Sequence, residues 1–148
     1  MIRSGVILLV EDSSDDVELT LRAFEKSRII SEIVVARDGE EALAYLHADG
    51  AYADRDPAVM PEVVLLDLKL PKLDGIEVLR RMRADERTRR VPVVVLTSSN
   101  EDSDVLATYE LGANSFVRKP VDFTRFLEVA RQLGVYWLGT NESPPART

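Results

Sequence analysis

Several residue types are absent or scarce in this chain, and each absence narrows its chemistry. The 148 residues include no cysteine, which excludes disulfides, thiolate nucleophiles and cysteine-ligated metals. The longest apolar runs, Val6–Val10 and Val91–Leu96, are far shorter than the ~18 residues of a membrane span. Positive charge is not in surplus, because the chain has 19 Lys and Arg and 26 Asp and Glu, which gives a net charge of −7. With no recognisable signal peptide, we expect an acidic cytoplasmic protein that neither spans a membrane nor binds nucleic acid.

What is present is a regular alternation of short apolar runs and amphipathic stretches. The five runs are Val6–Val10, Ile33–Ala36, Val63–Leu66, Val93–Leu96 and Ser115–Arg118. The first, third and fourth are apolar throughout and rich in β-branched residues, which is typical of parallel strands buried on both faces. Apolar residues recur at helical spacing after each run: Val17/Leu21/Phe24, Ala42/Leu43/Leu46, Ile76/Leu79/Met82, Val105/Leu106/Tyr109/Leu111 and Phe123/Phe126/Leu127/Ala130. Five consecutive βα units predict one α/β domain with an open parallel sheet covered by helices on both faces.

Two segments lie outside this alternation. The stretch Asp49–Glu62 is polar and interrupted by prolines, so we expect a long loop. The 15 residues after Leu133 end in Glu-Ser-Pro-Pro-Ala-Arg-Thr, and we expect them to form a disordered tail. We therefore divide the chain into a domain over residues 1–134 and a C-terminal extension over residues 135–148.

Polar side chains follow four of the predicted strands at the point where each strand ends. Glu11 and Asp12 follow the first run, Asp67 the third, Thr97 the fourth and Lys119 the fifth. Because ligands of open parallel sheets bind at the carboxyl ends of the strands, we expect these side chains to share one crevice. Each of them alone could be a helix cap or an ordinary surface residue, but their joint placement indicates a site.

The chemistry of this set indicates phosphoryl transfer. Three crowded carboxylates repel one another unless a cation lies among them, and ligands made only of oxygen favour Mg²⁺. A carboxylate beside Mg²⁺, a hydroxyl and an ammonium could attack phosphorus while the cations neutralise the charge of the phosphoryl oxygens.

These residues closely resemble the receiver domains of bacterial two-component response regulators. The matching positions are Glu11-Asp12, Asp67 with Pro71 and Asp74-Gly75 in LLDLKLPKLDG, Thr97-Ser98 and Lys119-Pro120, and the resemblance covers about Val6 to Leu133. It implies a flavodoxin-like (βα)5 sandwich with strand order 2-1-3-4-5.

The resemblance also implies a role for each matching residue. Asp67 would be the phosphoacceptor, and Thr97 and Lys119 would contact the phosphoryl group. Asp12, Asp67 and the backbone carbonyl of Lys69 would ligate Mg²⁺, with Glu11 acting mainly through water. The peptide bond before Pro120 would be cis. Phe116 stands where the family has a switch aromatic that moves together with Thr97, although it could also be an ordinary packing residue of an edge strand.

Two further features resemble the single-domain regulators that partner phytochrome histidine kinases: the long Asp49–Glu62 loop and the aromatic segment Val135–Leu138. The resemblance implies a signalling protein rather than an enzyme, with a sensor histidine kinase as partner, which could be a bacteriophytochrome. Tyr136 and Trp137 precede a polar tail, so we expect either a homodimer through this face or a segment folded back on the last helix.

Two other functions fit the predicted fold. A flavin-binding electron carrier would need a loop after the first strand that cradles phosphate, but the four carboxylates of Glu11–Asp16 would repel an anion. An Asp-nucleophile phosphohydrolase generally has a second Asp two residues after the first, where this chain has Lys69. The only histidine, His47, lies on the second predicted helix, so we expect the phosphoryl donor to be another protein.

Overall fold

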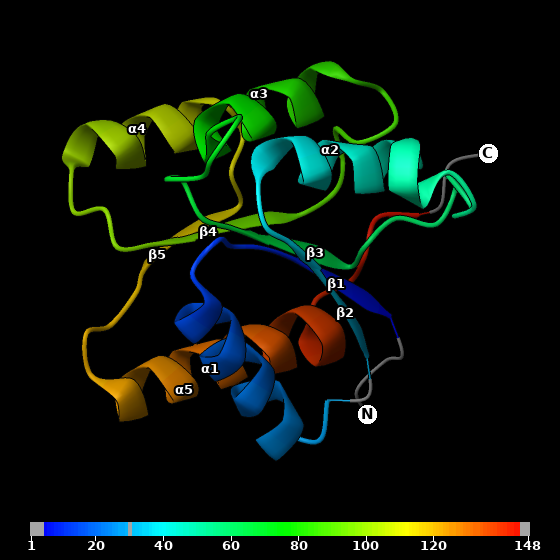
Figure 1. Ribbon diagram of the computed structural model, residues 1–148. Coiled ribbons are helices and arrows are strands. Elements are labelled where there is room, and N and C mark those ends of the chain that lie inside the picture. The colour runs from blue at the N-terminus through cyan, green and yellow to red at the C-terminus, as the bar shows by residue number, and fades with distance from the viewer. Residues whose placement is uncertain (1–4, 30, 146–148) are drawn as a thin grey trace.

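The computed structural model describes residues 5–29 and 31–145, which alternate strands and helices along the chain (Figure 1). The elements are β1 Val6–Val10, α1 Ser14–Lys26, β2 Glu32–Ala36, α2 Gly39–His47, η1 Gly50–Tyr52, β3 Val63–Leu66, α3 Gly75–Ala84, β4 Val93–Thr97, α4 Asp102–Glu110, β5 Ser115–Arg118, α5 Phe123–Val135 and η2 Tyr136–Thr140. All strand pairs are parallel and the order is β2-β1-β3-β4-β5, which confirms the predicted flavodoxin-like fold. None of the helices within the described residues is long and apolar enough to cross a membrane.

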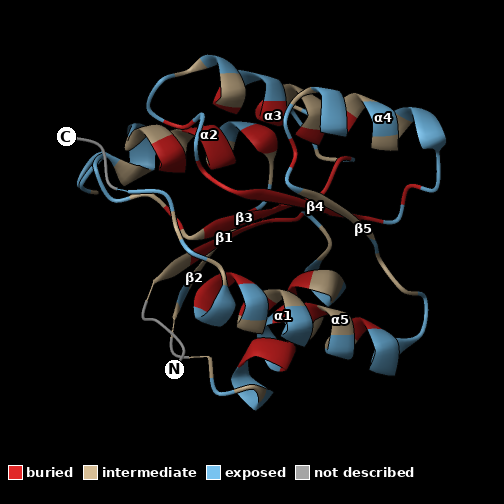
Figure 2. Cartoon of the chain, turned by 180° about the vertical axis from the view of Figure 1, so that it is seen from behind, coloured by how far each residue is buried: buried red, intermediate tan, exposed pale blue. Residues whose placement is uncertain are grey.

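The sheet separates two helical layers, with α1 and α5 on one face and α2, α3 and α4 on the other (Figure 1). Every residue of β3 is buried, and successive side chains alternate between the layers. Val64 and Leu66 join the core beneath α2 and α3, whereas Val63 and Leu65 join the core beneath α1 and α5. Figure 2 shows the central strands buried between helices whose outer faces are exposed. An apolar run without alternation is what this burial on both faces requires.

Aspartate and serine side chains begin four of the helices, because their oxygens accept otherwise unpaired backbone N–H groups. Ser13 accepts from the backbone N of Asp16 at 3.3 Å, and Asp38 accepts from that of Glu41 at 2.8 Å. Asp74 and Asp122 do the same for α3 and α5. These local signals set where the helices start beneath the carboxyl ends of the strands.

The apolar stripe expected on the fourth helix does not form a core face. Leu106 is 61% exposed and Tyr109 49% exposed, whereas Thr108 is fully buried. The Thr108 hydroxyl donates to the backbone oxygen of Asp104 at 2.9 Å, so its burial leaves no polar group unpaired. The predicted helix is confirmed and Leu111 at its end packs against the core, but tertiary contacts rather than periodicity selected the buried face of α4.

The long segment between α2 and β3 contains the short helix η1 and is held to α2 by Tyr52, whose hydroxyl donates to Glu41 at 2.7 Å, and by Arg55. Arg55 donates to the backbone oxygens of Tyr45 and Leu46 at 2.8 and 3.2 Å, and its guanidinium lies 4.3 Å from the centre of the Tyr45 ring. These contacts satisfy the carbonyl of Leu46 at the end of α2 and add a second donor to that of Tyr45, which also accepts from the backbone N of Ala48. The expected loop is therefore fastened to α2.

The expectation of a disordered tail after Leu133 is wrong for residues 134–140, which are helical. Helix α5 continues to Val135 and passes into the π-helical turn η2. Trp137 is only 8% exposed and Leu138 fully buried, and both belong to the core beneath α1 and α5. Gly134 permits this packing, because a Cβ there would lie 2.8 Å from Cε1 of Phe24. The last three residues of the predicted tail, 146–148, lie outside the described residues.

Candidate functional site

The predicted site residues lie where expected, at the carboxyl ends of β1, β3, β4 and β5. Backbone hydrogen bonds continue the sheet into the site, because the N–H of Asp67 donates to Val10 at 3.0 Å and that of Lys119 to Thr97 at 2.8 Å. Glu11 and Asp67 are buried and Asp12 is exposed. Residues that are far apart in the sequence therefore lie together at the hydrogen-bonded carboxyl edge of the sheet.

The turn after β3 holds Asp67 in place. The backbone N–H of Leu68 donates to Oδ1 of Asp67 at 2.7 Å, and the N–H of Gly75 donates to the oxygen of Leu68 at 2.8 Å. A Cβ at position 75 would lie 2.2 Å from the backbone oxygen of Asp67, so only glycine allows the start of α3 to approach this closely. The Asp74-Gly75 pair thus combines a helix cap with a close contact to the backbone of Asp67.

Lys119 lies at the centre of the acidic cluster. Its Nζ donates to Oε1 of Glu11, to Oδ2 of Asp16 at 2.8 Å and to Oδ2 of Asp67 at 3.1 Å. The Lys119 side chain is 8% exposed, so its charge is largely removed from water. One ammonium therefore balances part of the charge of three carboxylates.

The pKa values of Glu11, Asp67 and Lys119 are shifted in different directions by burial and by their neighbours. Burial raises the pKa of Glu11 to about 7, even though the hydrogen bond and charge of Lys119 act in the opposite direction. Burial also acts to raise the pKa of Asp67, but the charge of Lys119 and hydrogen bonds that include one from Thr97 outweigh it and lower that pKa. Burial acts to lower the pKa of Lys119, and its hydrogen bonds to Asp16 and Glu11 outweigh that effect and raise it. Asp67 is therefore ionised at neutral pH, as a nucleophile must be.

The acidic residues are also arranged as metal ligands. One carboxylate oxygen from each of Glu11, Asp12 and Asp67 lies within 4.8 Å of the other two. Three hard oxygen donors at this spacing fit a divalent cation such as Mg²⁺. Lys69, whose backbone carbonyl is expected to be a further ligand, is exposed two residues after Asp67.

The other predicted residues fall on β4, β5 and the turn that follows. Thr97 is fully buried at the end of β4, where its hydroxyl oxygen accepts from the backbone N of Ser99 at 3.4 Å. Phe116 is half-buried on β5 and packs against the core beneath α2 and α3. The Lys119–Pro120 bond is trans, so the prediction of a cis bond is wrong. A trans bond is intrinsically favoured, and with it Lys119 still reaches both Thr97 and the acidic cluster.

Asp16 is the site residue that the sequence analysis did not assign. It lies in the first turn of α1, four residues after Asp12, and its carboxylate binds Lys119. That Asp16 follows Glu11 and Asp12 closely was visible in the sequence. That Lys119, from the far edge of the sheet, would pair with Asp16 was not.

The comparisons with known proteins agree with this geometry. Residues 7–131 match the model of the response regulator receiver domain. The chain belongs to this family. The assignment favours a response regulator over the flavin carrier and the phosphohydrolase.

Individual relatives of this receiver domain cover almost the whole chain. The probable methanogenesis regulatory protein FilR2 of Methanothrix harundinacea is 43% identical over 141 residues, which cover 94% of this chain and 87% of that protein. The response regulator Rcp1 of Synechocystis sp. is 39% identical over 95% of this chain and 94% of its own length.

Two solved structures are similar to this receiver domain over nearly their full length. The crystal structure of Mn²⁺-bound Rcp1 matches with a TM-score of 0.88 and 38% identity, covering 95% of this chain and 99% of that one. The phosphorylated cyanobacterial phytochrome response regulator RcpA matches with a TM-score of 0.90 and 36% identity, covering 97% and 100%. The protein is thus a response regulator homologous to those of phytochromes.

Proposed function

We propose that Asp67 accepts a phosphoryl group from the phosphohistidine of a sensor kinase. The observation that carries this proposal is the position of the Asp67 carboxylate, which ends a buried strand, lies 3.1 Å from Lys119 and is grouped with Glu11 and Asp12. Glu11 also follows a buried strand and binds Lys119, but burial raises its pKa to about 7, so it is the weaker candidate for an ionised nucleophile. The pairing that lowers the pKa of Asp67 keeps it ionised for attack.

The reaction balances as a transfer between two side chains. A carboxylate oxygen of Asp67 attacks phosphorus, an acyl phosphate bond forms, and the P–N bond to the kinase histidine breaks with the electron pair leaving on the imidazole. Lys119 and the hydroxyl of Thr97 donate to the phosphoryl oxygens and stabilise their negative charge. Mg²⁺, when bound by Glu11, Asp12, Asp67 and the carbonyl of Lys69, supplies further positive charge at those oxygens.

Thr97 and Phe116 form the proposed switch. Thr97 reaches the site from the end of β4, and Phe116 lies on the neighbouring β5, paired with Val95. Movement of the Thr97 hydroxyl toward a phosphoryl oxygen would leave space that Phe116 fills. Phe116 has no hydroxyl, so packing alone must stabilise its inward position.

The proposed role is signalling by protein contact rather than turnover of a substrate. The kinase partner is of the phytochrome type, because RcpA is a phytochrome response regulator and resembles this chain over its full length. We propose that the protein acts in the cytoplasm, where sensor kinases use ATP. The net charge of −7 supports a protein partner and not nucleic acid.

We also propose a homodimer through the C-terminal face. Of the two aromatic residues that suggested it in the sequence, only Tyr136 still supports it. Trp137 is buried in its own chain, so it does not support an interface. Tyr136 is 48% exposed beside the edge strand β5 and lines a hollow together with Asn114 and Gln132. Changing Tyr136 to Ser should shift the mass by light scattering toward the 16.6 kDa monomer, and a wild type that is already monomeric would exclude the dimer.

The test of phosphorylation is intact-mass analysis after incubation with acetyl phosphate and Mg²⁺. The wild type should gain one phosphate and Asp67→Asn none, while Asp54→Asn, at an exposed loop position, should behave as wild type. Equal labelling of Asp67→Asn would overturn the assignment. Transfer rates from purified phosphorylated kinases, including a phytochrome kinase, then test the partner.

A further inference from the structure

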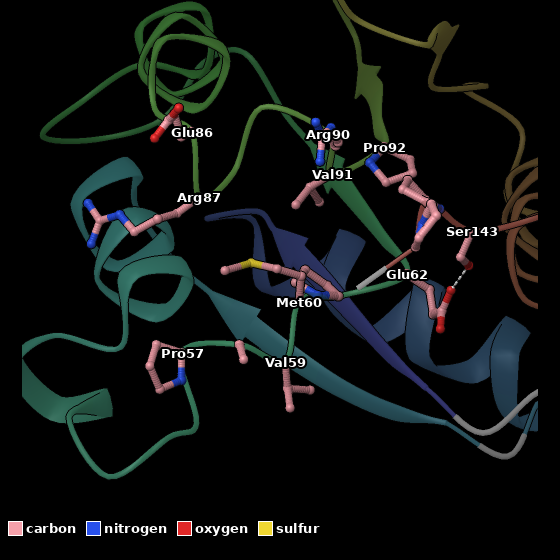
Figure 3. A pocket seen from close by; sticks show the side chains of 14 residues that line it. Pro57, Val59, Met60, Glu62, Glu86, Arg87, Arg90, Val91, Pro92 and Ser143 are labelled. Atoms are coloured by element: carbon pink, nitrogen blue, oxygen red, sulfur yellow. Dashed lines mark hydrogen bonds between the residues drawn. The ribbon is translucent and has the colours of Figure 1, made fainter. Parts of the chain in front are cut away.

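An apolar cavity lies at the opposite end of the sheet from the acidic site. It is a cavity of about 570 Å³ at the amino ends of β3 and β4 (Figure 3). Its walls come from the loop before β3, the turn between α3 and β4, and the C-terminal segment; they include Pro57, Val59, Met60, Arg90, Val91 and Pro144. The volume lies within the range of about 300–1,000 Å³ that is typical of small-molecule sites.

The walls are held by specific contacts. Arg55 ties the loop to the end of α2 through the oxygens of Tyr45 and Leu46, and it also donates to the oxygen of Val59. On the other side, the hydroxyl of Ser143 donates to the carboxylate of Glu62 (Figure 3). The cavity is therefore formed before any ligand arrives, which reduces the entropic cost of binding.

Two of the four charged residues that line the cavity, Glu62 and Arg87, already have partners. Arg87 makes two hydrogen bonds with the carboxylate of Asp85, at 2.7 and 3.1 Å, and Glu62 holds Ser143. The carboxylate of Glu86 points away from the centre of the cavity, whereas Arg90 lies beside Val91, across from Met60 (Figure 3). Within residues 5–29 and 31–145, no hydrogen bond or ion pair engages the Arg90 guanidinium.

We propose that this cavity binds a small organic anion with an apolar body and one carboxylate. Met60, Val91 and Pro57 supply apolar walls on which such a body can pack. The free guanidinium of Arg90 offers two parallel donors to a carboxylate, the geometry in which arginine binds such groups best. The ligand class follows from this combination, because Arg90 would repel an apolar cation, and a neutral apolar molecule would gain no ion pair from this exposed guanidinium.

The cavity is separate from the acidic site. β3 runs from Val63 beside the cavity to Leu66 beside Asp67, and β4 runs from Val93 to Thr97. Loss of the proposed ligand site should therefore leave phosphorylation of Asp67 intact, so the two proposals can fail independently.

The experiment is a fluorescence titration with 1-anilinonaphthalene-8-sulfonate, an apolar organic anion, followed by displacement with octanoate. We expect saturable binding to the wild type and displacement by octanoate at concentrations well below those needed for octanol. Arg90→Leu should weaken octanoate binding by about tenfold or more, as expected for loss of a charge-assisted hydrogen bond. Met60→Asp should weaken both the probe and octanoate, because it places a carboxylate in the apolar wall.

Arg89→Leu is the matched control, since Arg89 is the exposed neighbour of Arg90 and does not line the cavity. It should bind octanoate and keep its melting temperature as the wild type does, and all variants should remain folded and accept phosphate. Equal affinity for octanol and octanoate, or unchanged binding by Arg90→Leu, would overturn the proposal. Light scattering that shows a wild-type dimer dissociated by Met60→Asp would also overturn it, because a second copy of the chain would then occupy the cavity.

Discussion

The Nζ of Lys119 lies 3.1 Å from Oδ2 of Asp67, although 52 residues separate them in the chain. The two residues end different strands of one parallel sheet, and β4 lies between those strands. The ammonium also holds Glu11 and Asp16, so it is the counter-ion of the whole cluster. Stability, metal binding and phosphoryl transfer therefore all depend on this one side chain.

Replacing Lys119 with Met should destabilise the protein in buffer without metal. The change leaves Glu11, Asp16 and Asp67 without their cation, and removal of one partner from a buried pair costs about 3 kcal/mol or more. Lys72→Met is the control, because Lys72 is 61% exposed and lies 3.6 Å from Asp38. Urea unfolding at pH 8 measures both variants, and equal losses of stability would contradict the role of Lys119.

The free energy of unfolding should fall between pH 4.5 and 7 because of Glu11. Its pKa is raised from 4.5 to about 7 in the folded protein, so the native state retains a proton that the unfolded chain releases in this range. Stability from this group is thus fully present below pH 4.5 and is lost as the pH rises to 7, by about 3 kcal/mol at about 1.36 kcal/mol per pKa unit. Asp67 has the opposite effect on the free energy of unfolding. Its pKa is lowered in the folded protein, so the stability it contributes is lost as the pH falls.

Glu11→Gln should remove this dependence. In urea titrations with a chelator present, the variant should become more stable relative to the wild type as the pH increases from 4.5 to 7. A constant difference between the two proteins across this range would show that Glu11 is ionised in the fold throughout.

Mg²⁺ should raise the melting temperature of the wild type. A ligand that binds only the native state adds about 2.7 kcal/mol at 100 times its Kd. Asp12→Ala should show a much smaller shift, because it removes the exposed member of the carboxylate set. In the absence of metal the same variant should be at least as stable as the wild type, since one repelling charge is gone. Identical Mg²⁺ shifts in both proteins would exclude Asp12 as a ligand.

Trp137→Ala should unfold the C-terminal segment from the core beneath α1 and α5. The side chain is 92% buried by area, being 8% exposed, and truncation of a buried large aromatic costs about 3–5 kcal/mol. Tyr136→Ala is the matched control, because Tyr136 is half exposed and contacts the edge of Trp137 with ring centres 5.1 Å apart. Truncation of the Tyr136 side chain should lower the free energy of unfolding by about 1 kcal/mol. Thermal or urea unfolding separates the two cases, and a larger loss for Tyr136→Ala would contradict the packing described.

The order of elements and the position of the acidic site were open to prediction because their signals are local. An unbroken β-branched run such as Val63–Leu66 is stable only when both faces are buried, and a residue directly after such a run must lie at the edge of the sheet. Asp67, Thr97 and Lys119 could therefore be placed without knowing a single contact. The Asp caps of α2, α3 and α5 are equally local, since each acts on a backbone N–H two or three residues away.

Only the tertiary structure decided which of several allowed contacts each side chain makes. Lys119 could have faced solvent or the cluster, and the packing of α1 against α5 places Asp16 where Lys119 can bind it. Trp137 could have formed an interface, and close packing at Gly134 directs it into its own core instead. Leu106 is apolar yet exposed, and the bond before Pro120 is trans. These outcomes depend on the free energy of packing among distant segments, which a periodic pattern along the chain does not contain.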